Sequence, residues 1–196
     1  MRALFGLMIL LTPALAFAQT TGGVTKVDNG TNNQQSVVRA PGDRSTVSQV
    51  AGQGSRNNVQ SAVTASAGAP PNRVVQTTGG TGNVQTAVIT GGGNVVEQSA
   101  GPGNSGSVQS VTITGGSGNT VRQSSNGGAN IQSAVTTGQG SSVVQTQNGQ
   151  GNIETVVQTG SGNVAVQSQT GTGHVSNLKQ KGGQTDNVIQ GPGASQ

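Results

Sequence analysis

Residues 147–180 read QNGQGNIETVV, QTGSGNVAVQS, QTGTGHVSNLK and Q, so a glutamine returns every eleven residues. A glycine follows two places behind each of the first three glutamines, and an asparagine or histidine follows five places behind. Eleven residues are too few for a helix-turn-helix unit but accommodate one strand and one tight turn. Because no single unit of this length buries a core, the repeat predicts units that stack on near-copies of themselves, as in a β-solenoid.

The same pattern extends over residues 31–190 as two alternating kinds of half-repeat, each opening at a marker asparagine or its replacement. Half-repeats of the first kind begin at Asn33, Asn58, Asn83, Ser107, Asn130, Asn152 and His174. Those of the second kind begin at Ser45, Asn72, Asn94, Asn119, Ser141, Asn163 and Asn187. The sequence therefore predicts an all-β fold, a cross-β-like solenoid of about seven stacked strand-turn-strand rungs.

The positions of the prolines test this assignment of half-repeats independently. An internal strand cannot lose an N–H from its hydrogen-bond ladder, so prolines must lie between the strands. The prolines that follow Pro13 all meet this requirement: Pro41, Pro70, Pro71, Pro102 and Pro192.

The inward face of the first strand in each rung stays open at this point. Val59 and Val63 make one face apolar, whereas Ala62 makes the other face apolar as well. A slip of one residue exchanges the two faces of a strand.

The N-terminal residues 1–18 differ from the rest of the chain. Arg2 precedes an apolar run over residues 3–11, and the small-residue site Ala16-Phe17-Ala18 ends the segment. This pattern predicts a secretory signal peptide cut before Gln19, too short to span a bilayer. We expect residues 19–30 to form a flexible N-terminal segment, residues 31–190 the repeat solenoid and residues 191–196 a tail.

Composition argues against several function classes. The chain has no cysteine, and both phenylalanines and both methionines lie in the predicted signal peptide, so neither disulfides nor aromatics build the core. Charged residues make up 7% and form no basic cluster, which argues against nucleic-acid binding.

No catalytic or metal-binding constellation stands out in the sequence. His174 is the only histidine and stands at an asparagine position, without cysteine or second histidine as a partner. Glu97 and Glu154 are far apart in the repeat, and we expect both to be solvated or strand-edge charges. We therefore expect no enzyme activity, no cofactor, no metal and no small-molecule substrate.

Stacked rungs place each residue above its counterpart, so in-register amides are expected to form side-chain ladders in which each group satisfies the next. The residues predicted to form these self-assembly ladders are Asn58, Asn83, Asn94, Asn119, Asn130, Asn152, Asn163, Gln98, Gln123, Gln145, Gln147, Gln158, Gln167, Gln169 and Gln180. No capping helix is predicted at either end of the repeat. Both end rungs are then expected to template another strand, and head-to-tail contacts of this kind yield filaments.

The tandem spacing Gln-x-Gly-x-Gly-Asn-x-Ala-x3-Gln in residues 147–180 resembles the curlin repeat, with His174 in place of Asn and Ser176 in place of Ala. The resemblance implies a subunit of curli-like extracellular amyloid fibres used in cell adhesion and biofilm matrix. It also implies passage through the periplasm and an outer-membrane secretion pore, a nucleator as partner, and a secretion-targeting role for residues 19–30. Curlins usually carry some aromatic residues, which are absent from the repeats here. Whether the chain is the major fibre subunit or the minor nucleator stays open.

Two other classes compete with a fibre subunit. One is a soluble monomeric β-solenoid that binds a regular surface such as ice or glycan, to which Thr112-Ile113-Thr114 would be suited. The other is a disordered spacer or matrix protein.

Overall fold

The computed structural model describes residues 17–21, 23–66 and 69–192, and within these residues it contains strands and no helix. The strands of the nine-stranded sheet, sheet A, are β1 (Phe17–Thr21), β2 (Val24–Asp28), β4 (Thr46–Ala51), β6 (Arg73–Thr78), β8 (Val95–Ala100), β10 (Thr120–Gly128), β12 (Ser142–Gln150), β14 (Val164–Thr172) and β16 (Thr185–Gln190). Those of the seven-stranded sheet, sheet B, are β3 (Gln34–Arg39), β5 (Val59–Ala65), β7 (Val84–Thr90), β9 (Val108–Thr114), β11 (Ile131–Thr137), β13 (Ile153–Thr159) and β15 (Val175–Lys181).

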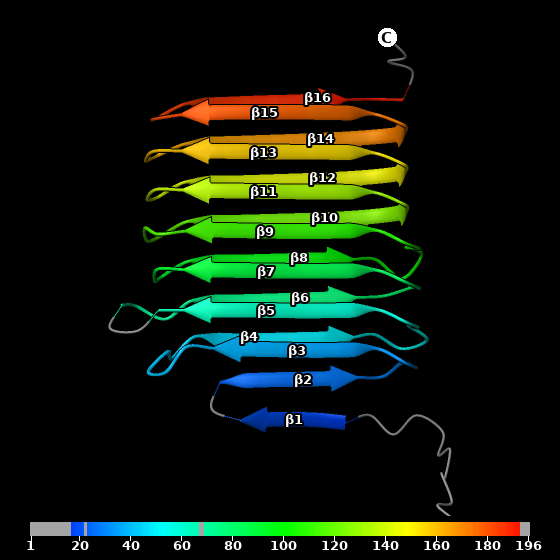
Figure 1. Cartoon of the computed structure of the whole chain (residues 1–196). Coiled ribbons are helices and arrows are strands. Elements are labelled where there is room, and N and C mark those ends of the chain that lie inside the picture. The colour runs from blue at the N-terminus through cyan, green and yellow to red at the C-terminus, as the bar shows by residue number, and fades with distance from the viewer. Residues whose placement is uncertain (1–16, 22, 67–68, 193–196) are drawn as a thin grey trace, which may run out of the picture.

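The chain alternates between the two sheets, and each strand pairs in parallel with the strand one turn away, as Figure 1 shows. The exception is β1, which pairs antiparallel with β2 at the N-terminal end. The prediction of an all-β solenoid is confirmed. Stacking is the physical reason, because one turn supplies only a few valines and alanines and needs its neighbours to complete a core.

The solenoid has about eight turns where the sequence predicted about seven, because β2 adds a strand at the N-terminal end. Residues 24–28, expected to be part of a flexible segment, pair with β4 from Val24 opposite Val47 to Asp28 opposite Ala51. Residues 1–16 of the predicted signal peptide and residues 193–196 of the predicted tail lie outside the described residues.

Alternating burial identifies the inward face of the first strand, which the sequence left open. In β5 the side chains of Gln60, Ala62 and Thr64 are buried, whereas Val59 and Val63 are half-buried on the outer face. The inward apolar column of sheet B is therefore the one that contains Ala62, and its fully buried members are alanines and valines. Short side chains in this column leave room for the glutamines that enter the core from sheet A.

The glycine two places behind each repeated glutamine has a steric cause. Gly149 has φ 130°, and a Cβ at this position would lie 1.8 Å from the carbonyl oxygen of Gly171, one turn further along. Only glycine combines this backbone conformation with so close an approach between successive turns. The repeated glycine of the sequence is thus a requirement of stacking one turn directly on the next.

The core between the sheets contains a narrow apolar cluster in which no side chain is larger than isoleucine. Its fully buried members are Val47, Ala62, Val74, Ala87, Ile89, Val96, Val111, Ile113, Val121, Ala134, Val143, Val156 and Ala165. Buried polar side chains outnumber the apolar ones among the described residues. Since buried polar groups destabilise a fold unless they are hydrogen-bonded, the arrangement of these groups decides whether the core is stable.

Candidate assembly site

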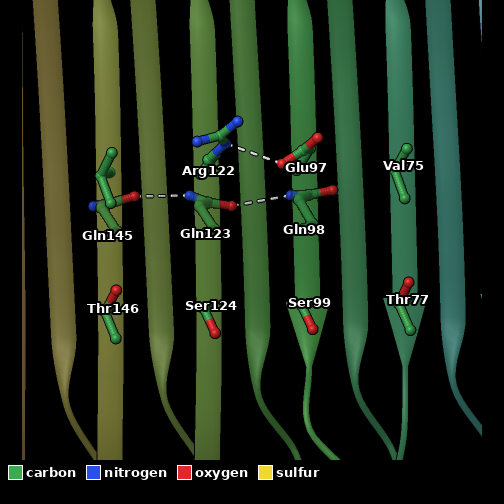
Figure 2. A pocket seen from close by; sticks show the side chains of 11 residues that line it. Val75, Thr77, Glu97, Gln98, Ser99, Arg122, Gln123, Ser124, Gln145 and Thr146 are labelled. Atoms are coloured by element: carbon green, nitrogen blue, oxygen red, sulfur yellow. Dashed lines mark hydrogen bonds and ion pairs between the residues drawn. The ribbon is translucent and has the colours of Figure 1, made fainter.

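A single column of glutamines runs along the middle of sheet A. Its members are Gln49, Gln76, Gln98, Gln123, Gln145 and Gln167, all buried. From Gln49 to Gln145, each Nε2 donates to the Oε1 of the next glutamine at 2.8–3.0 Å, and Gln167 at the end donates to the hydroxyl of Ser176 at 2.8 Å. Each also donates to a backbone carbonyl of sheet B at 2.9–3.4 Å, so the column joins successive turns and ties the two sheets together. Figure 2 shows the bonds between Gln98, Gln123 and Gln145.

A second glutamine column runs along sheet B, and the sequence prediction missed it. It consists of Gln35, Gln60, Gln85, Gln109 and Gln132, joined by Nε2 to Oε1 bonds of 2.7–3.1 Å. Each of these amides also donates across to a carbonyl of sheet A, as Gln85 does to Thr77 at 2.9 Å. The signal was present in the sequence, because a glutamine follows two places behind the marker in each of these half-repeats.

The four glutamines spaced by eleven residues belong to two shorter columns near the C-terminal end. Gln147 donates to Gln169 at 3.1 Å in sheet A, and Gln158 donates to Gln180 at 2.7 Å in sheet B. The Gln147 column continues to Gln190 at 2.6 Å. The spacing of eleven thus alternates between the sheets, and the vertical repeat is twenty-two residues except at the last step, from Gln169 to Gln190, which is twenty-one.

The marker residues form one column at each side of the solenoid, where the turns meet the strands. On one side lie Asn33, Asn58, Asn83, Ser107, Asn130, Asn152 and His174. On the other side lie Ser45, Asn72, Asn94, Asn119, Ser141 and Asn163, and the next position is taken by Gln184, so the prediction of Asn187 as the last marker is wrong.

The asparagines bond differently from the predicted amide-to-amide ladder. The Oδ1 of Asn58 accepts the backbone N–H of Asn83 at 2.8 Å, and most markers repeat this side-chain-to-backbone contact. An amide-to-amide bond joins only some pairs, such as Asn119 to Asn94 at 3.0 Å. Asparagine is one methylene shorter than glutamine, so its oxygen meets the neighbouring backbone first. This contact lets a serine hydroxyl replace it, as Ser107 and Ser141 do.

Glu154 occupies the glutamine position of β13 and is fully buried, so the expectation of a solvated or strand-edge charge is wrong for this residue. Gln132 donates to its Oε2 at 3.3 Å, while its Oε1 is buried without a hydrogen-bond partner. Burial raises the pKa of Glu154 to about 8, against the lowering effect of the Gln132 hydrogen bond. The sheet B column ends at Glu154, because its unpartnered Oε1 makes no hydrogen bond to Ser176, the register partner on the next turn.

Glu97 behaves as expected, as a half-exposed charge on the outer face of sheet A. Arg73 and Arg122 contact its carboxylate at 2.6 and 3.0 Å, and the hydrogen bond from Arg73 lowers the pKa of Glu97. The Arg122 contact is drawn in Figure 2, beside a hollow lined also by Val75 and Val144. The two charged residues that line this hollow, Glu97 and Arg122, are therefore paired with each other. Within residues 17–21, 23–66 and 69–192, no three potential metal-ligating side chains come together.

The two sheets end in strands that have a hydrogen-bonded neighbour on one side only. In sheet B these are β3 and β15, and in sheet A they are β1 and β16. The inward apolar column of sheet B also opens at both ends, where Val37 and Leu178 are only partly buried. Strand edges with free N–H and C=O groups pair readily with another strand.

No known protein family, curated protein or solved structure matches the chain. The described residues contain no helix with the length and apolar character needed to cross a membrane. The function is therefore inferred from the side-chain columns and from the end strands that are paired on one side only.

Proposed function

We propose that the chain is a secreted structural subunit that self-assembles through its end strands into curli-like cross-β fibres for cell adhesion and biofilm matrix. One observation supports this above all. Both sheets consist of in-register parallel strands apart from the antiparallel β1, both end in strands paired on one side only, and the apolar column of sheet B reaches the same ends. A second copy placed end to end would continue the strand pairing and the apolar column of sheet B.

The glutamine columns also give the stack a direction. Every glutamine-to-glutamine bond has its donor on the turn nearer the N-terminus and its acceptor on the turn nearer the C-terminus, as from Gln76 to Gln98. Turning a copy over reverses this order. Copies that meet head to tail keep one order throughout and form a contact that does not close, which favours filaments over dimers.

One observation favours a soluble solenoid that binds a regular surface such as ice or glycan. Thr114, Thr137 and Thr159 lie in register on the outer face of sheet B, so a threonine repeats at each of these turns. Thr-x-Thr itself does not recur in adjacent turns, and the same face carries valine and isoleucine columns. This function remains the second candidate.

Incubation of the purified chain distinguishes these functions. A fibre subunit gives a rising β signal, sedimentable fibres and diffraction spacings of about 4.7–4.8 Å and about 10 Å. A chain that stays folded and monomeric at high concentration contradicts self-assembly and supports the surface binder. A chain that stays coil supports the spacer.

A further inference from the structure

We propose that the surface which receives the next copy is the joint edge of β3 and β4, and that β2 leaves this edge before a copy adds. The arriving partner is a second copy of this chain, which docks through its β15 and β16. This inference rests on the proposed self-assembly and assigns its two contact surfaces.

The first argument is the number of strands. Sheet A contains eight strands in parallel pairing, β2 to β16, whereas sheet B contains seven. If β16 of one copy pairs with β2 of the next, sheet B lacks a strand between β15 and β3. If β15 pairs with β3 instead, β2 occupies the place of β16. Without β2 each copy contributes seven strands to each sheet, and both sheets continue through the junction.

The second argument is the mismatch between β2 and the columns that it covers. The inward positions of β4 are Val47, Gln49 and Ala51, all buried, and β2 places Lys26 opposite Gln49. Nothing in the described part of the chain donates to the buried Oε1 of Gln49. Lys26 donates instead to the carbonyl oxygen of Gln35 at 2.9 Å. Leaving a buried acceptor unsatisfied costs about 1–3 kcal/mol, so β2 covers β4 imperfectly.

The same strand is a poor template for a further copy. All five residues of β2 are only half-buried, and its inward positions include the charges of Lys26 and Asp28. Inward-pointing charges are a device that natural sheets use against edge pairing. On the other side β2 pairs with β1, and the cleavage predicted before Gln19 removes Phe17 and Ala18 from that strand.

The third argument is the fit of the proposed junction. Following the columns, β15 on β3 places Leu178 over Val37, which completes the apolar column at both of its open ends. It also places Gln180 over Arg39. The carboxylate of Asp186 accepts a hydrogen bond from Gln180 at 3.1 Å, so it comes within about one strand spacing of the Arg39 column.

A reversible disulfide between β2 and β4 tests whether β2 must leave the edge of β4 before a copy adds. Thr25 and Ser48 are register partners of β2 and β4, and the chain has no cysteine of its own. In the Thr25→Cys, Ser48→Cys double variant, called the lock variant, oxidation fixes β2 on β4. The matched control is Ser99→Cys, Ser124→Cys, whose partners lie on the internal strands β8 and β10.

A locked copy still offers β15 and β16, so it adds once to a fibre end and then blocks it. We expect the oxidised lock variant, at one tenth of the wild-type concentration, to slow seeded wild-type elongation at least tenfold. Thiol reduction should restore the rate, and the internal control should show no redox dependence. If the oxidised and the reduced lock variant leave the rate of seeded wild-type elongation equal, this inference is overturned while self-assembly stays intact. Absence of fibres from the wild type would overturn the proposed function itself.

Two further variants test the inference without a disulfide. Lys26→Gln supplies a donor to Gln49 and should slow spontaneous assembly by holding β2 in place. Asp186→Arg should slow elongation at low salt, and Arg39→Asp added to the same chain should restore it. Unchanged rates in both Lys26→Gln and Asp186→Arg would contradict the assigned contact surfaces.

Discussion

The buried carboxyl of Glu154 makes stability depend on pH in a way that Glu154→Gln should abolish. Burial holds the pKa of this group near 8 in the folded chain, against 4.5 for an ordinary glutamate. Between these two values the folded chain keeps a proton that the unfolded chain has released. Stability therefore falls as the pH rises from about 4.5 to about 8, and stays at its lower level above that window.

The size of the effect follows from the width of the window. One pKa unit corresponds to about 1.4 kcal/mol, so the difference between these two pKa values amounts to about 5 kcal/mol of unfolding free energy. With a urea m value on the order of 2 kcal/mol/M, the unfolding midpoint should fall by about 2 M between pH 5 and pH 9. Glutamine keeps the shape of the side chain, removes the titration and places an amide donor at the end of the sheet B column at every pH.

Urea unfolding of the dilute, unassembled chain at pH 5, 7 and 9 measures this effect. We expect the wild-type midpoint to fall across the series and the midpoint of Glu154→Gln to stay level. Glu97→Gln is the matched control, since it removes an exposed, ion-paired carboxylate and should keep the wild-type trend. If the midpoint of Glu154→Gln falls in parallel with the wild type, the buried carboxyl is not the origin of the pH dependence.

Two substitutions test the columns and the turns. Gln123→Ala removes a buried member of the sheet A ladder and should cost about 2–4 kcal/mol, because its neighbours lose their bonds and a cavity remains. Ser124→Ala on the exposed side of the same strand should change the urea midpoint little, and equal effects would argue against the ladder. Gly149→Ala meets the carbonyl oxygen of Gly171 at 1.8 Å and should lower the melting temperature far more than Gly151→Ala, which meets nothing within 4 Å. Equal melting temperatures would contradict the close stacking of the turns.

Much of the architecture was predictable because its information is local and repeated. The glutamine spacing of residues 147–180 and the prolines between strands predict strand length, turn position and stacking without reference to distant contacts. The members of the sheet A glutamine column follow from the same frame. The sheet B column was predictable in principle from Gln60 and Gln85, which stand two places behind their markers, but its role depends on which face of the strand points inward.

A stack of repeated strands with glutamine over glutamine follows from the repeat alone, because identical residues at a constant spacing must coincide once the turns repeat. Which face of each first strand is buried emerged only when the two sheets were seen together, since apolar residues lie on both faces of the strand. The folded chain also revealed that Asn58 and its counterparts bond to backbone, that Glu154 is enclosed, and that residues 24–28 join sheet A. Each of these depends on the neighbours that two sheets bring together, which no single repeat contains.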